Sequence, residues 1–184
     1  MYDGPATPDE VLQYWFVELT DADWWRKDPG LDRRIAGRFG ATLAAAARCE
    51  LVGWRKTARG RLAEVIVLDQ FSRNVHRDNA ASFANDALAL ALAQEAVRGG
   101  FDQQLAVTER AFFYLPYMHS ESARIHQDAL RLFDQPGLES NLDFERRHHA
   151  IIARFGRYPH RNAILGRAST VEELAFLQQP GSSF

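Results

Sequence analysis

Signals that begin and end helices recur along the whole chain, and they constrain its fold more than any other feature. Thr7 can cap a helix that starts at Pro8, and Glu10 completes a capping box three residues after the cap. Thr170 and Glu173 have the same spacing near the end of the chain. The first and last elements are therefore predicted to be helices, with their starting points set by local hydrogen bonds.

Between these ends, apolar residues repeat with a helical period. The predicted helices cover, in order, residues 7 to about 19, 31–51, 61 to about 75, 82 to the glycine pair 99–100, 108 onward, 121 or 122 to 133, 138 or 141 to 155, and 171–177. Ser82 is expected to cap the fourth, and Pro116 to interrupt the fifth. The chain has no alternating β-branched run and no Asn-Gly turn, so no strand is expected.

These elements predict an all-α fold of about eight helices joined by short polar links. With 184 residues, the chain suits one domain spanning residues 1–184. A composition of 46% hydrophobic and 25% charged residues is typical of globular proteins and excludes intrinsic disorder. No clear internal repeat of about 34 residues is present, yet successive helices of similar length are compatible with stacked antiparallel pairs.

Charge and composition also narrow the location and the partners. The net charge of -2 argues against nucleic-acid binding. Cys49 is the only cysteine, which excludes an intrachain disulfide, and its alanine-rich surroundings predict a buried thiol. The N-terminus lacks the pattern of a signal peptide, and no apolar run approaches the ~20 residues of a membrane span. We therefore expect a cytoplasmic protein without a membrane or nucleic-acid partner, whose oligomeric state stays open.

The third predicted helix carries a polar patch that continues its apolar stripe. Asp69, Gln70, Arg73 and Asn74 occupy positions i, i+1, i+4 and i+5, and so share one face of the helix. Because an unpaired buried polar group costs about 1–3 kcal/mol, the patch must be hydrogen-bonded or open to a cleft. Asp69 and Arg73 have the spacing of an ion pair. A structural network and a ligand site are both compatible with this pattern.

The segment "FFYLPYMHSE" is a second candidate, at residues 112–121. His119 lies close to Glu121 in sequence, so it could act as a general base. His119 and His126 are seven residues apart, but no further ligands at a recognisable spacing accompany them, so no metal site is predicted. A purely structural histidine is the alternative.

A strongly basic stretch is the third candidate. Residues 146–171 contain six arginines, three histidines and no carboxylate, while residues 1–145 hold 16 basic and 22 acidic residues. Such asymmetry implies either pairing with carboxylates elsewhere in the fold or capture of an anion. Asp69, Glu121 and Asp128 are the expected internal partners. Pro159 stiffens a loop that presents four polar side chains: Arg157, His160, Arg161 and Asn162.

The sequence lacks the short motifs of several common enzyme and nucleotide-binding classes. It contains no Walker loop and no GxGxxG, GxSxG or CxxC motif, and no cofactor is expected.

Four motifs together resemble a known bacterial family. They are "LDQFSRNVHRD", "FFYLPYMHSE", "RFGRYPHRNAILGR" and "STVEELAFL", and their order and span resemble the family called domain of unknown function 924. The resemblance covers nearly the whole chain, with small departures at Ser72, where proline is frequent, and Tyr158, where phenylalanine is frequent. It implies an all-helical, tetratricopeptide-like fold of stacked helical hairpins. It implies no activity, substrate or catalytic residue.

Three hypotheses follow for the function. In the first, the chain is a binding module whose polar pocket takes an anionic small molecule or an acidic peptide, through Asp69, Gln70, Arg73, Asn74, Arg157, His160, Arg161 and Asn162. In the second, it is an enzyme in which His119 or His160, with Glu121, performs acid–base catalysis on an anionic substrate. In the third, the polar groups form a structural network and the function lies elsewhere on the surface.

Overall fold

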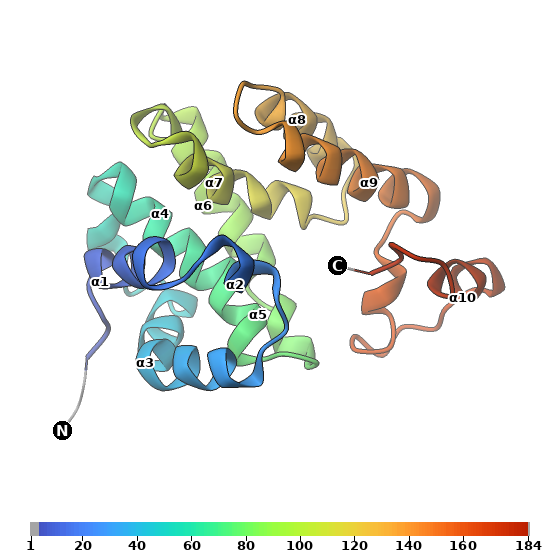
Figure 1. Ribbon diagram of the computed structural model, residues 1–184, viewed down its shortest axis with the longest axis horizontal. Coiled ribbons are helices and arrows are strands. Elements are labelled where there is room, and N and C mark those ends of the chain that lie inside the picture. Colours follow the sequence, from blue (N-terminus) through green and yellow to red (C-terminus); the bar gives the residue numbers. More distant parts are fainter. Residues whose placement is uncertain (1–3, 184) are drawn as a thin grey trace.

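A computed structural model describes residues 4–183, and all regular structure in that range is helical (Figure 1). The first half contains α1 (Pro8–Gln13), η1 (Tyr14–Glu18), α2 (Asp21–Trp25), α3 (Pro29–Ala47), η2 (Val52–Lys56), α4 (Ala58–Ile66), η3 (Val67–Phe71) and α5 (Ser72–Val75). The second contains η4 (Ala80–Phe83), α6 (Asp86–Arg98), η5 (Asp102–Gln104), α7 (Val107–Met118), α8 (Ala123–Phe133), α9 (Glu139–Phe155), η6 (Pro159–Arg161) and α10 (Val171–Leu177).

The all-α prediction is confirmed, and both capping boxes form. Thr7 accepts from the Glu10 amide at the start of α1, and Thr170 accepts from the Glu173 amide at the start of α10. Gly156 ends α9 in the left-handed region, at φ 68°, where glycine is favoured over all other residues. The one-domain prediction also spans residues 1–3 and 184, which lie outside the described range, and it stays a prediction, as does the tetratricopeptide-like arrangement.

The helices pack around one large core. Helix α4 contacts α1, α6 and α7, while α6, α7, α8 and α9 pack one against the next in chain order (Figure 1). Two π-helical turns, η1 and η3, lie inside longer helical stretches. Large apolar residues of the helices are fully buried in this core, among them Trp15, Ile35, Phe39 and Leu62.

The C-terminal segment packs on a small core of its own and not on the large one. Ile151, Ile152 and Tyr158 form a small second core, against which Phe155 and Phe176 pack. Helix α10 lies beside η6, away from the α1–α5 half of the molecule (Figure 1). Because this second core is small, polar contacts must contribute much of the attachment of this segment.

Several predicted boundaries are wrong. The second helix ends at Ala47, not Leu51, and Cys49 is exposed with a left-handed φ of 59°, so the prediction of a buried thiol fails. The third helix begins earlier, at Ala58, because Thr57 caps it. Ser82 is not the cap of α6 but part of a 3-10 turn that Asn79 caps.

Pro116 does not interrupt its helix. Helix α7 continues through it to Met118. A proline removes one helical hydrogen bond, but with two helical residues left after it the loss is confined to the last turn.

Candidate functional site

The polar patch of the third helix divides between two places. Asp69 and Gln70 lie in η3 and are buried, and the Gln70 amide donates to Asp69 at 2.6 Å. Asn74 turns away from them and donates to Asp32 of α3 at 2.8 Å, beside Arg77. The prediction that all four side chains form one group therefore fails for Asn74, because the π-helical turn alters the register of the residues that follow it.

Arg73 joins two carboxylates. Its guanidinium lies 3.1 Å from Asp69, the predicted i, i+4 ion pair, and also donates in bidentate fashion to Asp86 at 2.9 and 3.0 Å. Asp86 stands in the first turn of α6, where an acidic residue is ordinary, so nothing local in the sequence distinguishes it as a site residue.

His119 follows the end of α7 and meets Asp69, not Glu121. Its Nδ1 lies 2.7 Å from Asp69 Oδ1. Burial and then the positive charge of Arg73 lower the pKa of His119, with Asp69 opposing them, so the imidazole is neutral near pH 7. Burial alone would raise the pKa of Asp69, but Arg73 and His119 hold it well below its usual range. A neutral His119 therefore donates from Nδ1 to an ionised Asp69, which leaves Nε2 as an acceptor.

Glu121 has other partners. It accepts from the Tyr158 amide at 2.7 Å and from both ends of the Arg167 guanidinium at 2.6 and 2.9 Å. Burial would raise its pKa, but Arg167 outweighs burial and keeps Glu121 ionised. The pairing of His119 with Glu121 expected from the sequence is therefore corrected to a pairing of His119 with Asp69.

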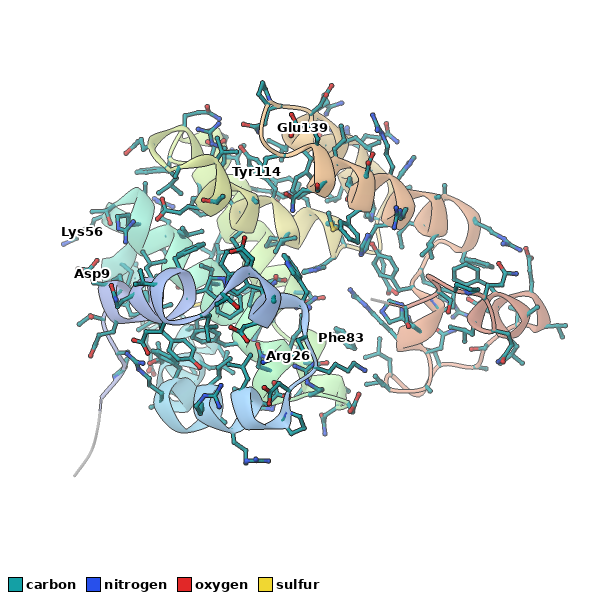
Figure 2. The ribbon with its side chains drawn as sticks, in the orientation of Figure 1. Asp9, Arg26, Lys56, Phe83, Tyr114 and Glu139 are labelled. Carbon is teal, nitrogen blue, oxygen red and sulfur yellow. The ribbon has the colours of Figure 1, made fainter. Side chains whose placement is uncertain are left out.

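Arg161 brings the basic stretch to the same cluster. Its guanidinium contacts two aromatic rings, at 4.5 Å from the centroid of Phe83 (labelled in Figure 2) and 4.6 Å from that of Tyr158. One nitrogen donates to Asp86 at 3.2 Å and another to the His119 carbonyl at 3.1 Å. The third, Nε, is buried and has no acceptor in the described part of the chain. Burial and then the charge of Arg73 lower the pKa of Arg161, which indicates that positive charge is only partly compensated here.

Most of the other arginines of the stretch bind carboxylates of the same chain. Arg157 binds Glu173 of α10 at 2.6 and 2.8 Å, and Asn162 donates to Glu173 at 3.3 Å. Arg154 binds Glu172 at the surface. Among the expected partners Glu121 does bind this stretch, whereas Asp128 pairs with Arg131 of its own helix. Arg157 and Asn162 therefore belong to the attachment of α10 and lie outside the Arg161 cluster.

His160 lies beside the cluster, next to Tyr158. Its ring lies 5.5 Å from that of Tyr158, and burial followed by the charge of Arg161 lowers its pKa to about 4. His126 takes no part, because it pairs with the buried Glu145 at 2.6 Å.

Five residues thus form what we call the Arg161 cluster: Asp69, Arg73, Asp86, His119 and Arg161. They come from η3, α5, α6, η6 and the residue after α7. Sequence analysis found four of them and missed Asp86, together with Phe83, whose ring faces two of the arginines. The sequence did contain one indication of such a partner. The arginines of residues 146–171 have no carboxylate within their own stretch, so they need carboxylates from elsewhere in the fold.

Within residues 4–183, no group of three or more His, Cys, Asp or Glu side chains is arranged to hold a metal ion. None of the described helices has both the length and the apolar character needed to cross a membrane.

Comparisons with known proteins agree with the fold. The chain is similar to a protein of unknown function from Agrobacterium tumefaciens whose structure is solved, with 39% identity and a TM-score of 0.89 over 93% of this chain and 96% of that one. No curated protein matches the chain. The family model DUF924, described as a bacterial protein of unknown function, matches residues 11–181. The chain therefore belongs to the DUF924 family of bacterial proteins.

Proposed function

We propose that this protein is a binding module for a small anionic molecule or an acidic peptide, and that the Arg161 cluster holds the anionic group. The observation that carries the proposal is the Nε–H of Arg161, a buried donor without an acceptor. Leaving such a donor unpaired costs about 1–3 kcal/mol, and more for a charged group, so an acceptor supplied by a ligand would recover that free energy.

Electrostatics support an anion over a neutral ligand. Arg73 and Arg161 share one carboxylate, Asp86. Burial is the main reason that the pKa values of His119, His160 and Arg161 are lowered, and the positive charge of Arg73 lowers all three further. A negative charge bound here would offset this part of the effect, the repulsion between positive groups.

The contacts of Arg161 with aromatic rings favour a binding site that is preorganised. Phe83 and Tyr158 both pack against the Arg161 guanidinium, and Tyr158 itself is anchored by its hydroxyl, which donates to the Met118 carbonyl at 2.5 Å. An arginine restrained before binding loses little side-chain entropy when a ligand arrives.

The test is titration calorimetry with phosphate, citrate and a short poly-glutamate peptide, on wild type and Arg161→Gln. We expect wild type to bind at least one of them and the variant to bind about tenfold more weakly, because one charge-assisted hydrogen bond is lost. Arg154→Gln is the matched control, since Arg154 lies in the same basic stretch but in an exposed ion pair. If wild type binds none of these anions, or if both variants bind equally well, the cluster is a structural network and the proposal is wrong.

An acid–base enzyme is the second candidate, favoured by the pair of His119 and Asp69. A buried carboxylate that orients a neutral imidazole leaves Nε2 free to accept a proton from a substrate or a water molecule. Hydrolysis of 4-nitrophenyl acetate and 4-nitrophenyl phosphate by wild type, His119→Gln and Asp69→Asn tests this role. If wild type hydrolyses both substrates no faster than His119→Gln does, the imidazole takes no part in hydrolysis and this candidate is wrong.

A further inference from the structure

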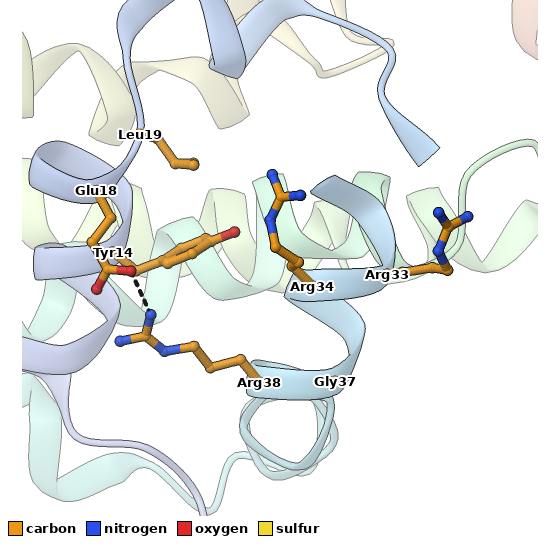
Figure 3. A pocket seen from close by; sticks show the side chains of 7 residues that line it. All are labelled: Tyr14, Glu18, Leu19, Arg33, Arg34, Gly37 and Arg38. Carbon is orange, nitrogen blue, oxygen red and sulfur yellow. Dashed lines mark hydrogen bonds and ion pairs between the residues drawn. The ribbon is translucent and has the colours of Figure 1, made fainter. Parts of the chain in front are cut away.

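A groove separate from the Arg161 cluster lies between η1 and the first half of α3 (Figure 3). It is open to solvent and has a volume of about 410 Å³, within the range of about 300–1,000 Å³ that small-molecule sites occupy. The groove is lined by Tyr14, Glu18, Leu19, Arg33, Arg34, Gly37 and Arg38. Neither the motifs of the sequence nor the proposed function uses these residues.

The groove carries more positive than negative charge. Arg34 and Arg38 are four residues apart and so share one face of α3, and Arg33 lines the groove from the neighbouring position. Glu18 is the only carboxylate among the lining residues, and Arg38 binds it at 2.7 Å (Figure 3). In the part of the chain that the structure describes, no ion pair is formed by Arg33 or Arg34, and both side chains are exposed. Two guanidinium groups at the groove are therefore available to an anion.

Tyr14 supplies a second and independent indication of a ligand. Its side chain is 4% exposed, and among residues 4–183 its buried hydroxyl has no hydrogen-bond acceptor, because the adjacent Arg34 can only donate. In Figure 3 the ring extends along the groove and the hydroxyl points toward Arg34. The ring is restrained by Arg38, whose guanidinium lies 4.9 Å from its centroid, and by Phe39 at 5.1 Å. The hydroxyl is thus held in one place, next to the exposed side chain of Arg34.

From these contacts we infer that the groove is a binding site for a phosphorylated small molecule. The phosphate would bind to Arg33 and Arg34, whose planar forks match its oxygens, and Arg34 would turn toward it. That movement would let the Tyr14 hydroxyl donate to the ligand and acquire the acceptor that it lacks. A dianionic phosphate would also balance the two arginine charges that no carboxylate compensates.

Gly37 leaves room for the ligand between the arginines. A Cβ built on Gly37 would meet no atom within 4 Å, so the space beside it is open. Gly37→Leu would fill this space without removing a charge, and a leucine in the middle of α3 improves helix propensity. This variant therefore blocks the groove while it leaves the fold intact.

The experiment is titration calorimetry of the full chain with pyrophosphate and with inorganic phosphate. We expect binding by wild type, and affinity lowered about tenfold or more by Arg34→Ala and by Gly37→Leu. Arg48→Ala is the matched control, because Arg48 lies just beyond the other end of α3 and binds Glu50. Arg161→Gln should leave this binding unchanged, which separates the groove from the Arg161 cluster.

Tyr14→Phe distinguishes a tyrosine that binds a ligand from one that only supports the fold. The variant removes a buried hydroxyl that has no acceptor, so the melting temperature should stay equal or rise, while affinity for pyrophosphate should fall several-fold. The inference is overturned if wild type does not bind pyrophosphate at millimolar concentration. It is equally overturned if Arg34→Ala and Gly37→Leu bind as wild type does.

Discussion

Gly60 shows how closely two backbone segments approach at the start of α4. A Cβ at this position would lie 2.0 Å from the Trp54 carbonyl oxygen of η2, a contact that only a backbone shift could relieve. Its amide also donates to the capping hydroxyl of Thr57 at 3.0 Å. A glycine is therefore required here by space and not by an unusual φ.

Gly60→Ala should destabilise the protein by about 3 kcal/mol, at the upper end of the usual cost of overpacking. Gly37→Ala is the control, because the same change in α3 meets no atom and should raise the free energy of unfolding by about 0.5–1 kcal/mol. Urea unfolding of both variants measures the two values. Equal effects of the two substitutions would contradict the role of the Trp54 carbonyl.

At His119, two neighbouring charges act in opposite directions. Arg73 lowers the pKa of the imidazole, while the carboxylate of Asp69 raises it by stabilising the protonated form. Asp69→Asn removes the raising influence, so the pKa of His119 should fall further below its ordinary value. Titration of the histidine ring signals by NMR measures this shift.

The same variant should lower the free energy of unfolding by about 3 kcal/mol, because the Arg73 guanidinium loses one of its two carboxylates. An increase in the His119 pKa in Asp69→Asn would mean that the two side chains do not interact as described.

Helix α10 is an element whose attachment depends on one carboxylate. Glu173 is 2% exposed and accepts from Nε and Nη2 of Arg157, from the Thr170 amide and from Asn162. The hydrogen bonds from Arg157 and then from Thr170 lower the pKa of Glu173 to about 2. Its neighbour Glu172 makes a single surface ion pair with Arg154.

Glu173→Gln should loosen α10, because an amide cannot accept from all four donors at once and carries no charge for Arg157. Hydrogen exchange of the α10 amides should become about tenfold faster or more, with little change in the α4 amides. Glu172→Gln is the matched control, since exposed ion pairs contribute little. Similar exchange rates in the two variants would argue that apolar packing alone holds α10.

Across the whole molecule, buried histidines make stability depend on pH. Burial lowers the pKa of His148 to about 3 and, together with Arg161, that of His160 to about 4, and His119 is shifted in the same direction. Such a histidine binds its proton more weakly in the folded than in the unfolded chain, so its contribution to stability is lost as pH falls below about 6.5. Glu145, whose pKa burial raises, works in the opposite direction.

The free energy of unfolding should therefore decrease steadily from pH 6.5 to pH 4, by up to about 1.4 kcal/mol per pH unit for each shifted histidine. Below pH 4.5, protonation of Asp69, Glu121 and Glu173, whose pKa values are lowered, should steepen the loss. Urea unfolding at a series of pH values measures the slope.

His148→Gln should make that slope shallower between pH 6.5 and pH 4, whatever its effect on stability at pH 7. The control is His76→Gln, which changes a half-buried histidine directly after α5, in the first half of the chain. An unchanged slope in His148→Gln would contradict the assignment of the pH dependence to buried histidines.

Local signals predicted the helices well, because caps and glycine terminators act within a few residues of themselves. The box of Thr170 and Glu173 and the left-handed Gly156 lie where the sequence indicated. The π-helical turns, the exposed Cys49 and the start of α6 were not predictable in this way, since packing against distant helices decides them.

The sequence by itself determined the all-α class, the family and the residues from which a site could be built. Only the tertiary structure decided their partners: Asp69 for His119, Asp86 for Arg161, and Glu173 for Arg157. The physical reason is that an ion pair depends on distance in space. Arg161 and Asp86 are 75 residues apart in the chain, and no periodicity or spacing relates them.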